Sequence, residues 1–346
     1  MQVLKILGKR LAGLVLLLLA LSIVTFGLLY LTGSDPARSL VGAKHVSAAQ
    51  LEAIRNQYHL NEPVWQQYLR WLVGMLQGNL GTSTRTQLPV ASMIASRFGI
   101  TLALAVMALV LALAVGLPLG ITAAKHAGGW QDRVITTLSI AGLSAPSYAV
   151  GLLLLYVLSA RLKLFPIYGI GNGSALDTFR HLLLPAITLA IGILASVVKI
   201  SRAALMREIS SDYTLFARSR GVSRRAITLG QLQNASLPIL TSSGLLIASL
   251  VSGTVIVETM FSLGGVGTLL QQSVTFGDIP CVQAITLVLA GIICISTAIV
   301  DTAAQVIDPR LRVRGTHRAA TAADEALAEI VAATSEEPRE EVAQHA

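Results

Sequence analysis

The chain has 346 residues, of which 53% are hydrophobic and 13% are charged. Soluble domains carry about 25% charged residues, so this composition excludes an ordinary soluble protein and favours a membrane protein. The formal net charge of +8 does not indicate a nucleic-acid partner, because basic residues of membrane proteins gather in cytoplasmic loops and set the orientation.

The charged residues are clustered, which leaves long apolar stretches between them. A helix that spans a bilayer needs about 20 mostly apolar residues. We expect the marginal fourth stretch to continue past Lys199, whose long side chain can reach the membrane interface. The sequence therefore predicts an all-α polytopic membrane protein with six transmembrane helices. The charge-free stretches that carry this prediction are 11–34, 98–124, 134–160, 182–198, 226–257 and 279–300.

Residues 1–32 contain the first of these helices. Lys5, Lys9 and Arg10 precede its apolar part, as basic residues do in a secretory signal peptide. The uncharged part is too long for a signal peptide, however, and no convincing small-residue cleavage site follows it. We therefore interpret it as a retained transmembrane helix.

Residues 33–98 are predicted to form an extracytoplasmic loop with two amphipathic helices. Ser47 and Gln50 form a capping-box pattern at the start of the first helix. Asn61 is the expected cap of the second helix, with Pro63 in its first turn. These helices pack on the outer membrane surface, and they can also offer a docking surface to an extracytoplasmic partner. Apolar side chains recur at helical spacing in the second helix at Trp65, Tyr68, Leu69, Leu72 and Leu76.

The membrane core is expected over residues 95–310, where no internal repeat is visible. Six spans place both termini on the same side of the membrane. Six arginines lie between Arg202 and Arg225, in one of the segments that would share that side, whereas the opposite loops at 161–181 and 260–282 hold three basic residues and none. The positive-inside rule therefore predicts a multi-pass protein of the cytoplasmic (inner) membrane with both termini in the cytoplasm.

Residues 315–346 form an acidic tail with almost no large apolar side chains. Such a segment cannot bury enough surface to fold alone. We expect the tail to be disordered or marginally helical.

No motif for enzymatic chemistry is present. The chain lacks a G-x-x-x-x-G-K-[ST] loop for ATP, an H-E-x-x-H motif and a G-x-S-x-G motif. We therefore predict no catalytic residue, no metal site and no cofactor bound by this chain. Cys281 and Cys294 are expected to pack in the last apolar stretch rather than to form a disulfide. The glycine-rich segment 263–270 is interpreted as a flexible turn.

Glu258 closes the fifth apolar stretch near its outer end. A charge at mid-membrane costs roughly 2.5–3.5 kcal/mol, so this carboxylate needs a reason to be there. It either lines a transport pathway or gate, or it stabilises the turn that follows. Ion-coupled transporters often carry buried acids or broken helices near the midplane, and the lack of convincing ones here weakens a secondary-transporter interpretation.

The segment 213–238 is the most informative part of the chain. It lies between the fourth and fifth apolar stretches and contains four arginines but no acid. Its pattern predicts a short helix, a break at Gly221 and a second helix with Ser223 as its N-cap. The small Ala217 and Gly221 permit close approach of another surface. A simpler alternative is a positive-inside loop that lies on anionic headgroups.

The letters FARSRG followed by NASLP resemble the cytoplasmic signature of ABC importer permeases. The longer run DYTLFARSRGVSRRAI and QNASLPILTSSG is similar to the peptide/nickel subgroup, the dipeptide and oligopeptide permease B type. GSDPA, GLSAPSYAVG, VIVETMFSLGGVGTLL and DPRLR agree in order and spacing, so the resemblance covers about residues 1–313. Two departures are Leu215 and Phe216 at positions where the general signature has Glu and Ala, and a third is Gly264, where many relatives have Pro.

This resemblance implies a type I ABC importer permease fold and a transport role for di- or oligopeptides. It implies pairing with a second, homologous permease, and with two ATPase subunits or one fused ATPase that bind ATP and Mg. An extracytoplasmic solute-binding protein would deliver the solute. The loop 213–238 would supply the coupling helix, in which Phe216 and Ala217 pack and Gly221 forms the bend. The residues expected at this contact are Leu215, Phe216, Ala217, Arg218, Arg220, Gly221, Arg224 and Pro238.

Two other function classes remain open from the residues alone. A self-sufficient channel or secondary transporter would work without an ATPase partner. An intramembrane enzyme would need a catalytic constellation, and the sequence contains none that we can identify. Neighbouring genes for P-loop ATPases and a second six-span chain would favour the permease.

Overall fold

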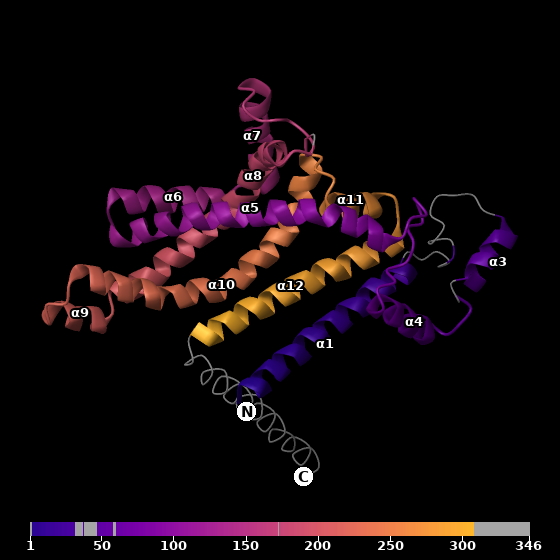
Figure 1. Cartoon of the computed structure of the whole chain (residues 1–346), viewed down its shortest axis with the longest axis horizontal. Helices are drawn as coiled ribbons and strands as arrows, with labels where there is room; N and C mark the ends of the chain where they lie inside the picture. Colours follow the sequence, from indigo (N-terminus) through magenta and orange to yellow (C-terminus); the bar gives the residue numbers. More distant parts are fainter. Residues whose placement is uncertain (1, 32–36, 38–46, 58–59, 172, 308–346) are drawn as a thin grey trace, which may run out of the picture.

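The computed structural model describes residues 2–31, 37, 47–57, 60–171 and 173–307. The predicted tail at 315–346 and most of segment 32–46 lie outside these residues. In the described part the fold is helical and no strand forms, although Thr82 and Pro89 make an antiparallel bridge. The helices are α1 (Gln2–Leu31), α3 (Ala48–Gln57), α4 (Val64–Leu76), α5 (Val90–Lys125), α6 (Trp130–Ser144), α7 (Ser147–Leu154) continuing as the π-helical η1 (Leu155–Arg161), α8 (Ala175–Ile209), α9 (Asp212–Ser219), α10 (Arg224–Met260), α11 (Val266–Thr275) and α12 (Ile279–Ile307) (Figure 1).

The long helices confirm an all-α polytopic membrane protein. Within the described ranges α5, α8 and α12 are each long and apolar enough to cross a membrane, and two bent pairs bring the number of spans to as many as five. Within α1 the described apolar segment Ala12–Gly27 is shorter than a span. The count of six therefore stays a prediction. As expected, α8 continues past Lys199, and it ends at Ile209.

The apolar stretch 134–160 is not one straight helix. α6 and the α7–η1 segment meet at an angle of 103°. Pro146 disfavours helical backbone at Ala145, whose ψ of 125° is extended, and α7 restarts immediately after the proline. In contrast, Pro118, Pro185 and Pro238 lie inside α5, α8 and α10, where neighbouring groups in a membrane bundle can compensate for the lost hydrogen bond.

The core is organised around α8, which packs against α5, α6, α7 and α10. Its apolar centre joins Leu104 and Ala108 of α5 to Leu189 and Ile193 of α8. Further along, a Cβ at Gly120 of α5 would collide with α8, so these two backbones approach closely. Small residues at helix contacts permit this kind of approach in membranes.

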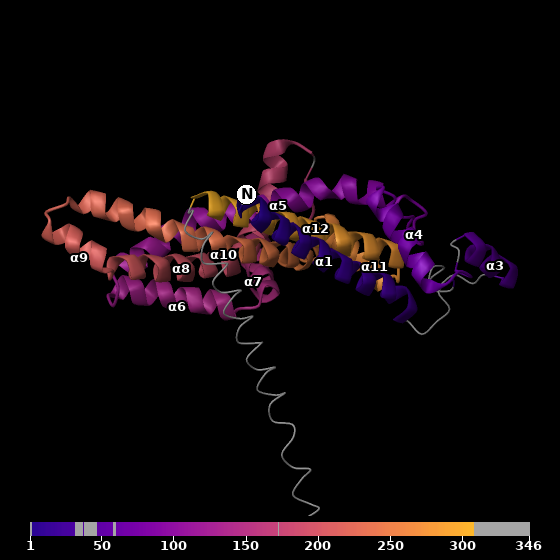
Figure 2. The same cartoon turned by 90° about the horizontal axis from the view of Figure 1, so that it is seen from below.

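The two ends of the molecule have different elements. Both views place α9 at one end and α3 and α4 at the other, with α1 and α12 side by side between them (Figures 1 and 2). Gln283 of α12 donates a 3.0 Å hydrogen bond to the carbonyl of Thr25 in α1. α4 packs on α1 through Tyr68 and Trp71, whose rings surround Phe26.

The predicted outer helices are present with changed details. The capping box is confirmed at α3, because the backbone N–H of Ser47 donates to Gln50 Oε1 at 2.9 Å and the Ser47 hydroxyl accepts from the Gln50 N–H. The expected cap Asn61 is wrong: Pro63 is the N-cap of α4, and the Asn61 amide instead donates to Asn56. α5 starts at Val90, inside the predicted loop 33–98.

Candidate functional site

The sharp turn from α8 into α9 is held by one carbonyl group. The hydroxyl of Ser211, the N-cap of α9, donates to the carbonyl of Glu208 at 2.6 Å. The hydroxyl of Thr214 donates to the same oxygen at 2.8 Å. Because Thr214 is buried, this short helix is anchored to the end of α8.

Gly221 ends α9 as the sequence predicts. Its φ of +75° is in the left-handed region that glycine adopts without steric cost. The Val222 N–H bonds to the Ala217 carbonyl and the Gly221 N–H bonds to the Arg218 carbonyl, both at 3.1 Å. These two bonds form a Schellman motif. Ser223 then caps α10, since its hydroxyl accepts from Ala226, which confirms the predicted helix, break and helix.

α9 is also joined to α10 by side-chain hydrogen bonds. Gln231 Nε2 donates to the Thr214 hydroxyl at 3.1 Å, and Asn234 Nδ2 donates to Glu208 Oε2 at 3.1 Å. Sequence reasoning missed this network, because Thr214, Gln231 and Asn234 look like ordinary polar residues of an exposed loop. Only the contacts of α9 with α10 and with the end of α8 show that two of them, Thr214 and Gln231, are buried.

The outer face of α9 presents two exposed apolar side chains among cations. Leu215 and Phe216 are 69% and 68% exposed, and Ala217 between them and the turn is half-buried. An exposed apolar patch with a polar rim is typical of a protein–protein contact. The cations around it are the exposed side chains of Arg218, Arg220, Arg224 and Arg225.

Pro238 lies apart from this surface. It is inside α10, about 21 Å along the helix from Arg224 at 1.5 Å per residue. The hydroxyls of Thr241 and Ser242 donate to its carbonyl, and α10 bends by 49° just beyond, between Ser242 and Leu246. The second half of the predicted loop 213–238 is therefore the beginning of a long helix, and Pro238 precedes its bend.

Glu258 lies in α10 and is fully buried. Its Oε2 accepts a 3.1 Å hydrogen bond from the Thr268 N–H at the start of α11. A Cβ at Gly265 would collide with its carboxylate, and one at Gly267 would collide with the Val255 backbone and lie close to that carboxylate. The carboxylate is therefore bonded to the turn that follows α10, which favours the second of its two predicted roles. The interpretation of segment 263–270 as a flexible turn is corrected accordingly. Gly265 and Gly267 are packed closely near Glu258 at the start of α11, and of the glycines in this segment only Gly264, with φ +70°, has a left-handed backbone.

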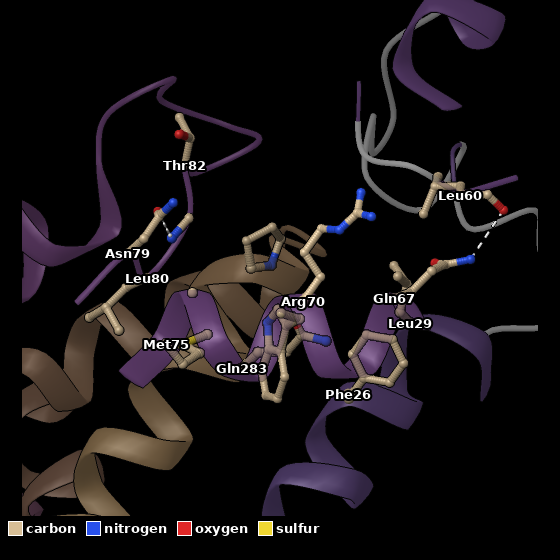
Figure 3. A pocket seen from close by; sticks show the side chains of 14 residues that line it. Phe26, Leu29, Leu60, Gln67, Arg70, Met75, Asn79, Leu80, Thr82 and Gln283 are labelled. Atoms are coloured by element: carbon tan, nitrogen blue, oxygen red, sulfur yellow. Dashed lines mark hydrogen bonds between the residues drawn. The ribbon is translucent and has the colours of Figure 1, made fainter. Parts of the chain in front are cut away.

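A pocket of about 260 Å³ lies at the opposite end from α9, between α1, α4, residues 79–82 and the start of α12 (Figure 3). Phe26, Leu29 and Trp71 form much of its apolar wall. Gln67 lies in the wall with its amide donating to the carbonyls of Leu60 and Glu62. The sequence did not predict this pocket, because its lining comes from segments far apart in the chain.

Two family matches cover most of the chain. Residues 116–313 match the family described as binding-protein-dependent transport system inner membrane component, and residues 3–105 match the N-terminal component of such membrane proteins. The chain belongs to this family of permeases. The first match contains α9, the Gly221 turn, all of α10 and α11.

Similar curated permeases agree with this assignment. The chain is 34% identical over 305 residues to the glutathione transport system permease protein GsiC of Escherichia coli K12, with 88% of this chain and 97% of that protein covered. GsiC of Pectobacterium atrosepticum matches with the same identity and coverage. The probable peptide ABC transporter permease protein y4tP of Sinorhizobium fredii is 32% identical over 309 residues, with 88% and 98% covered.

The resemblance to ABC importer permeases is thereby confirmed. The chain is a helical membrane permease subunit of an ABC importer. Its relatives are named as transport-system permeases rather than enzymes, in line with the missing catalytic motifs.

Proposed function

We propose that this permease forms half of the translocation path of an ATP-driven importer for peptides in the cytoplasmic membrane. Relatives at 34% and 32% identity are named for glutathione and for peptides, and glutathione is itself a short peptide. The choice among dipeptides, oligopeptides and related solutes depends on a cavity that this chain shares with a partner.

The partners proposed are a second homologous permease, two ATPase subunits or one fused ATPase, and an extracytoplasmic solute-binding protein. The ATPase subunits would bind ATP and Mg and carry out hydrolysis, since this chain contains no P-loop sequence. The membrane pair alternates between inward-facing and outward-facing states, as a two-state element that ATP binding shifts.

The observation that carries the coupling role is the exposed Leu215–Phe216 pair on a helix that is hydrogen-bonded to both of its neighbours. Phe216, Leu215 and Ala217 would pack in an apolar groove of an ATPase subunit. Arg218, Arg220 and Arg224 would pair with acidic groups at the rim of that groove. Large aromatic side chains and arginines are the residues that most often dominate protein contacts.

The orientation follows from the basic residues near α9. The turn between α5 and α6 lies at the same end of the molecule as α9 (Figure 1) and is flanked by the exposed Lys125 of α5 and Arg133 of α6. By the positive-inside rule we expect this end to be cytoplasmic, and both termini with it if α1 spans the membrane. The α3–α4 end would then face the solute-binding protein.

The decisive experiment is to solubilise a tagged chain gently from its native membrane and to identify the co-purifying proteins by mass spectrometry. We expect a second permease and ATPase subunits, and we expect Phe216→Ala to lower the recovery of the ATPase subunits. Leu229→Ala is the matched control, because Leu229 is an exposed apolar residue of α10. A chain that purifies alone, and that moves solute when reconstituted alone, would overturn the proposal.

A further inference from the structure

The first turn of α6 is fastened to α8 by a two-pronged ion pair. Arg202 Nε donates to Asp132 Oδ1 at 2.6 Å, and Arg202 Nη2 donates to Asp132 Oδ2 at 2.7 Å. Asp132 is only 4% exposed. Paired N–H groups on one carboxylate resist both sliding and rotation, which a single point contact does not.

Two further donors complete the coordination of this carboxylate. The backbone N–H of Gly128 donates to Oδ2 of Asp132 at 2.9 Å, and the Thr136 hydroxyl donates to Oδ1 at 3.2 Å. Gly128 belongs to the turn between α5 and α6, with φ +79°. The Asp132 side chain therefore joins three parts of the chain: the α5–α6 turn, the beginning of α6, and α8 at Arg202.

Helices α5 and α6 form a hairpin, and α5 is held to the same part of α8 by close packing. A Cβ at Gly116 of α5 would press on Val197, and one at Gly120 would collide with Ser201 and the Val198 carbonyl. Both helices of the α5–α6 hairpin are thus attached to α8 within the segment 197–202.

The coupling helix α9 is attached to α8 only a short distance further on. Glu208, whose carbonyl accepts from Ser211 and Thr214, lies six residues after Arg202, which is about 9 Å along a helix. The end of α8 therefore connects α9 to the hairpin through groups that are all hydrogen-bonded or closely packed.

We infer that the Asp132–Arg202 pair is the joint through which displacement of α9 is passed to the α5–α6 hairpin. Asp132 and Arg202 are in this sense positioning residues for transport, an inference that rests on the proposed coupling role of α9. When the joint is intact, α9, the end of α8 and the hairpin move together. When the Asp132–Arg202 pair is weakened, α8 still moves with α9, but the α5–α6 hairpin no longer moves with them to the same extent.

The test measures distances by electron paramagnetic resonance in the purified whole transporter, with Cys281 and Cys294 replaced by alanine. One pair of spin labels is placed at Ala127 in the turn and Asp212 at the start of α9, which are both exposed. In the otherwise unchanged complex we expect one narrow distance distribution that is the same without nucleotide and with ATP and vanadate. If the Ala127–Asp212 distance distribution changes with nucleotide in this complex, the proposal that the Asp132–Arg202 pair makes α9 and the hairpin move together is wrong.

Asp132→Asn and Arg202→Lys are the test variants. Asparagine at 132 can still accept from the Gly128 N–H but lacks the negative charge. Lysine at 202 keeps the positive charge but cannot make the two parallel hydrogen bonds of the arginine guanidinium group. We expect the Ala127–Asp212 distance in both variants to differ between the two nucleotide states, with uptake of labelled glutathione per ATP falling about fivefold. If the Asp132–Arg202 pair only stabilises the fold, the Ala127–Asp212 distance distribution should broaden equally in both nucleotide states. That result would also contradict the proposal. Arg207→Lys, an exposed change on the same helix, should behave as the unchanged complex.

A second label pair separates this inference from the coupling role itself. Labels at Ala127 and at the exposed Gln271 of α11 report whether nucleotide moves the hairpin relative to the outer end. If this distance does not respond to ATP and vanadate in the unchanged complex, the proposed coupling role of α9 is wrong, and so is the proposed role of the Asp132–Arg202 pair. If it responds while the Ala127–Asp212 distance also changes, only the joint is wrong.

Discussion

Gln231 of α10 donates a hydrogen bond to the Thr214 hydroxyl of α9, and that hydroxyl donates in turn to the Glu208 carbonyl at the end of α8. One buried hydroxyl thus joins three helices at the point where the chain reverses. The exposed Leu215–Phe216 pair is therefore carried on a fixed support rather than on a free loop.

The first prediction concerns this hydroxyl. Thr214→Val leaves the Gln231 amide buried without its acceptor, which costs about 1–3 kcal/mol. We expect faster hydrogen exchange at residues 212–221 and weaker recovery of ATPase subunits. Thr214→Ser keeps the hydroxyl and is the control. Equal exchange in the valine and serine variants would show that the hydroxyl does not anchor α9.

The second prediction concerns Gly221. A Cβ in the left-handed region costs about 1–2 kcal/mol per residue, so Gly221→Leu should disturb the end of α9. Gly221→Asn should be milder, because the short polar side chain of asparagine can hydrogen-bond locally in this conformation. The measurement is the ATPase activity of the purified complex with and without solute-loaded binding protein. We expect stimulation to be lost in the leucine variant, and normal stimulation there would contradict a role of the bend in coupling.

The third prediction distinguishes the two roles considered for Glu258. Glu258→Ala removes the acceptor of the Thr268 N–H and leaves a buried donor unpaired, at a cost of about 1–3 kcal/mol. We expect a lower Tm for the alanine variant and a smaller decrease for Glu258→Gln, which can still accept. A changed solute affinity at unchanged Tm would instead support pathway lining.

The fourth prediction concerns the contact of α5 with α8. Gly120→Ala places a methyl group against Ser201 and the α8 backbone, and overpacking of this kind costs about 1–3 kcal/mol. Gly192→Ala, at a helical glycine with no neighbour within 4 Å of the new Cβ, should be neutral or stabilising by about 0.5–1 kcal/mol. Thermal unfolding of both variants in detergent checks the difference, and an equal Tm for the two would refute close packing at Gly120.

Much of the α9–α10 module is predictable from local sequence. Gly221 is the residue that a left-handed helix end requires, and Ser223 is a preferred N-cap. Both effects depend on groups within a few residues, so tertiary structure does not change them. The burial of Thr214, in contrast, depends on Gln231, seventeen residues later in the chain, and no local pattern specifies that contact.

The sequence by itself determined the membrane class, the helical fold, the break at Gly221 and the resemblance to permeases, because apolar length, charge clustering and turn chemistry act locally. Only the tertiary structure decided that Glu258 accepts a hydrogen bond from the start of α11, that the stretch 134–160 turns sharply at Pro146, and that Asp132 meets Arg202. Asp132 and Arg202 are seventy residues apart in sequence. Their ion pair forms because close packing of α5 on α8 brings the α5–α6 turn beside α8. That packing results from the whole helix bundle rather than from either segment alone.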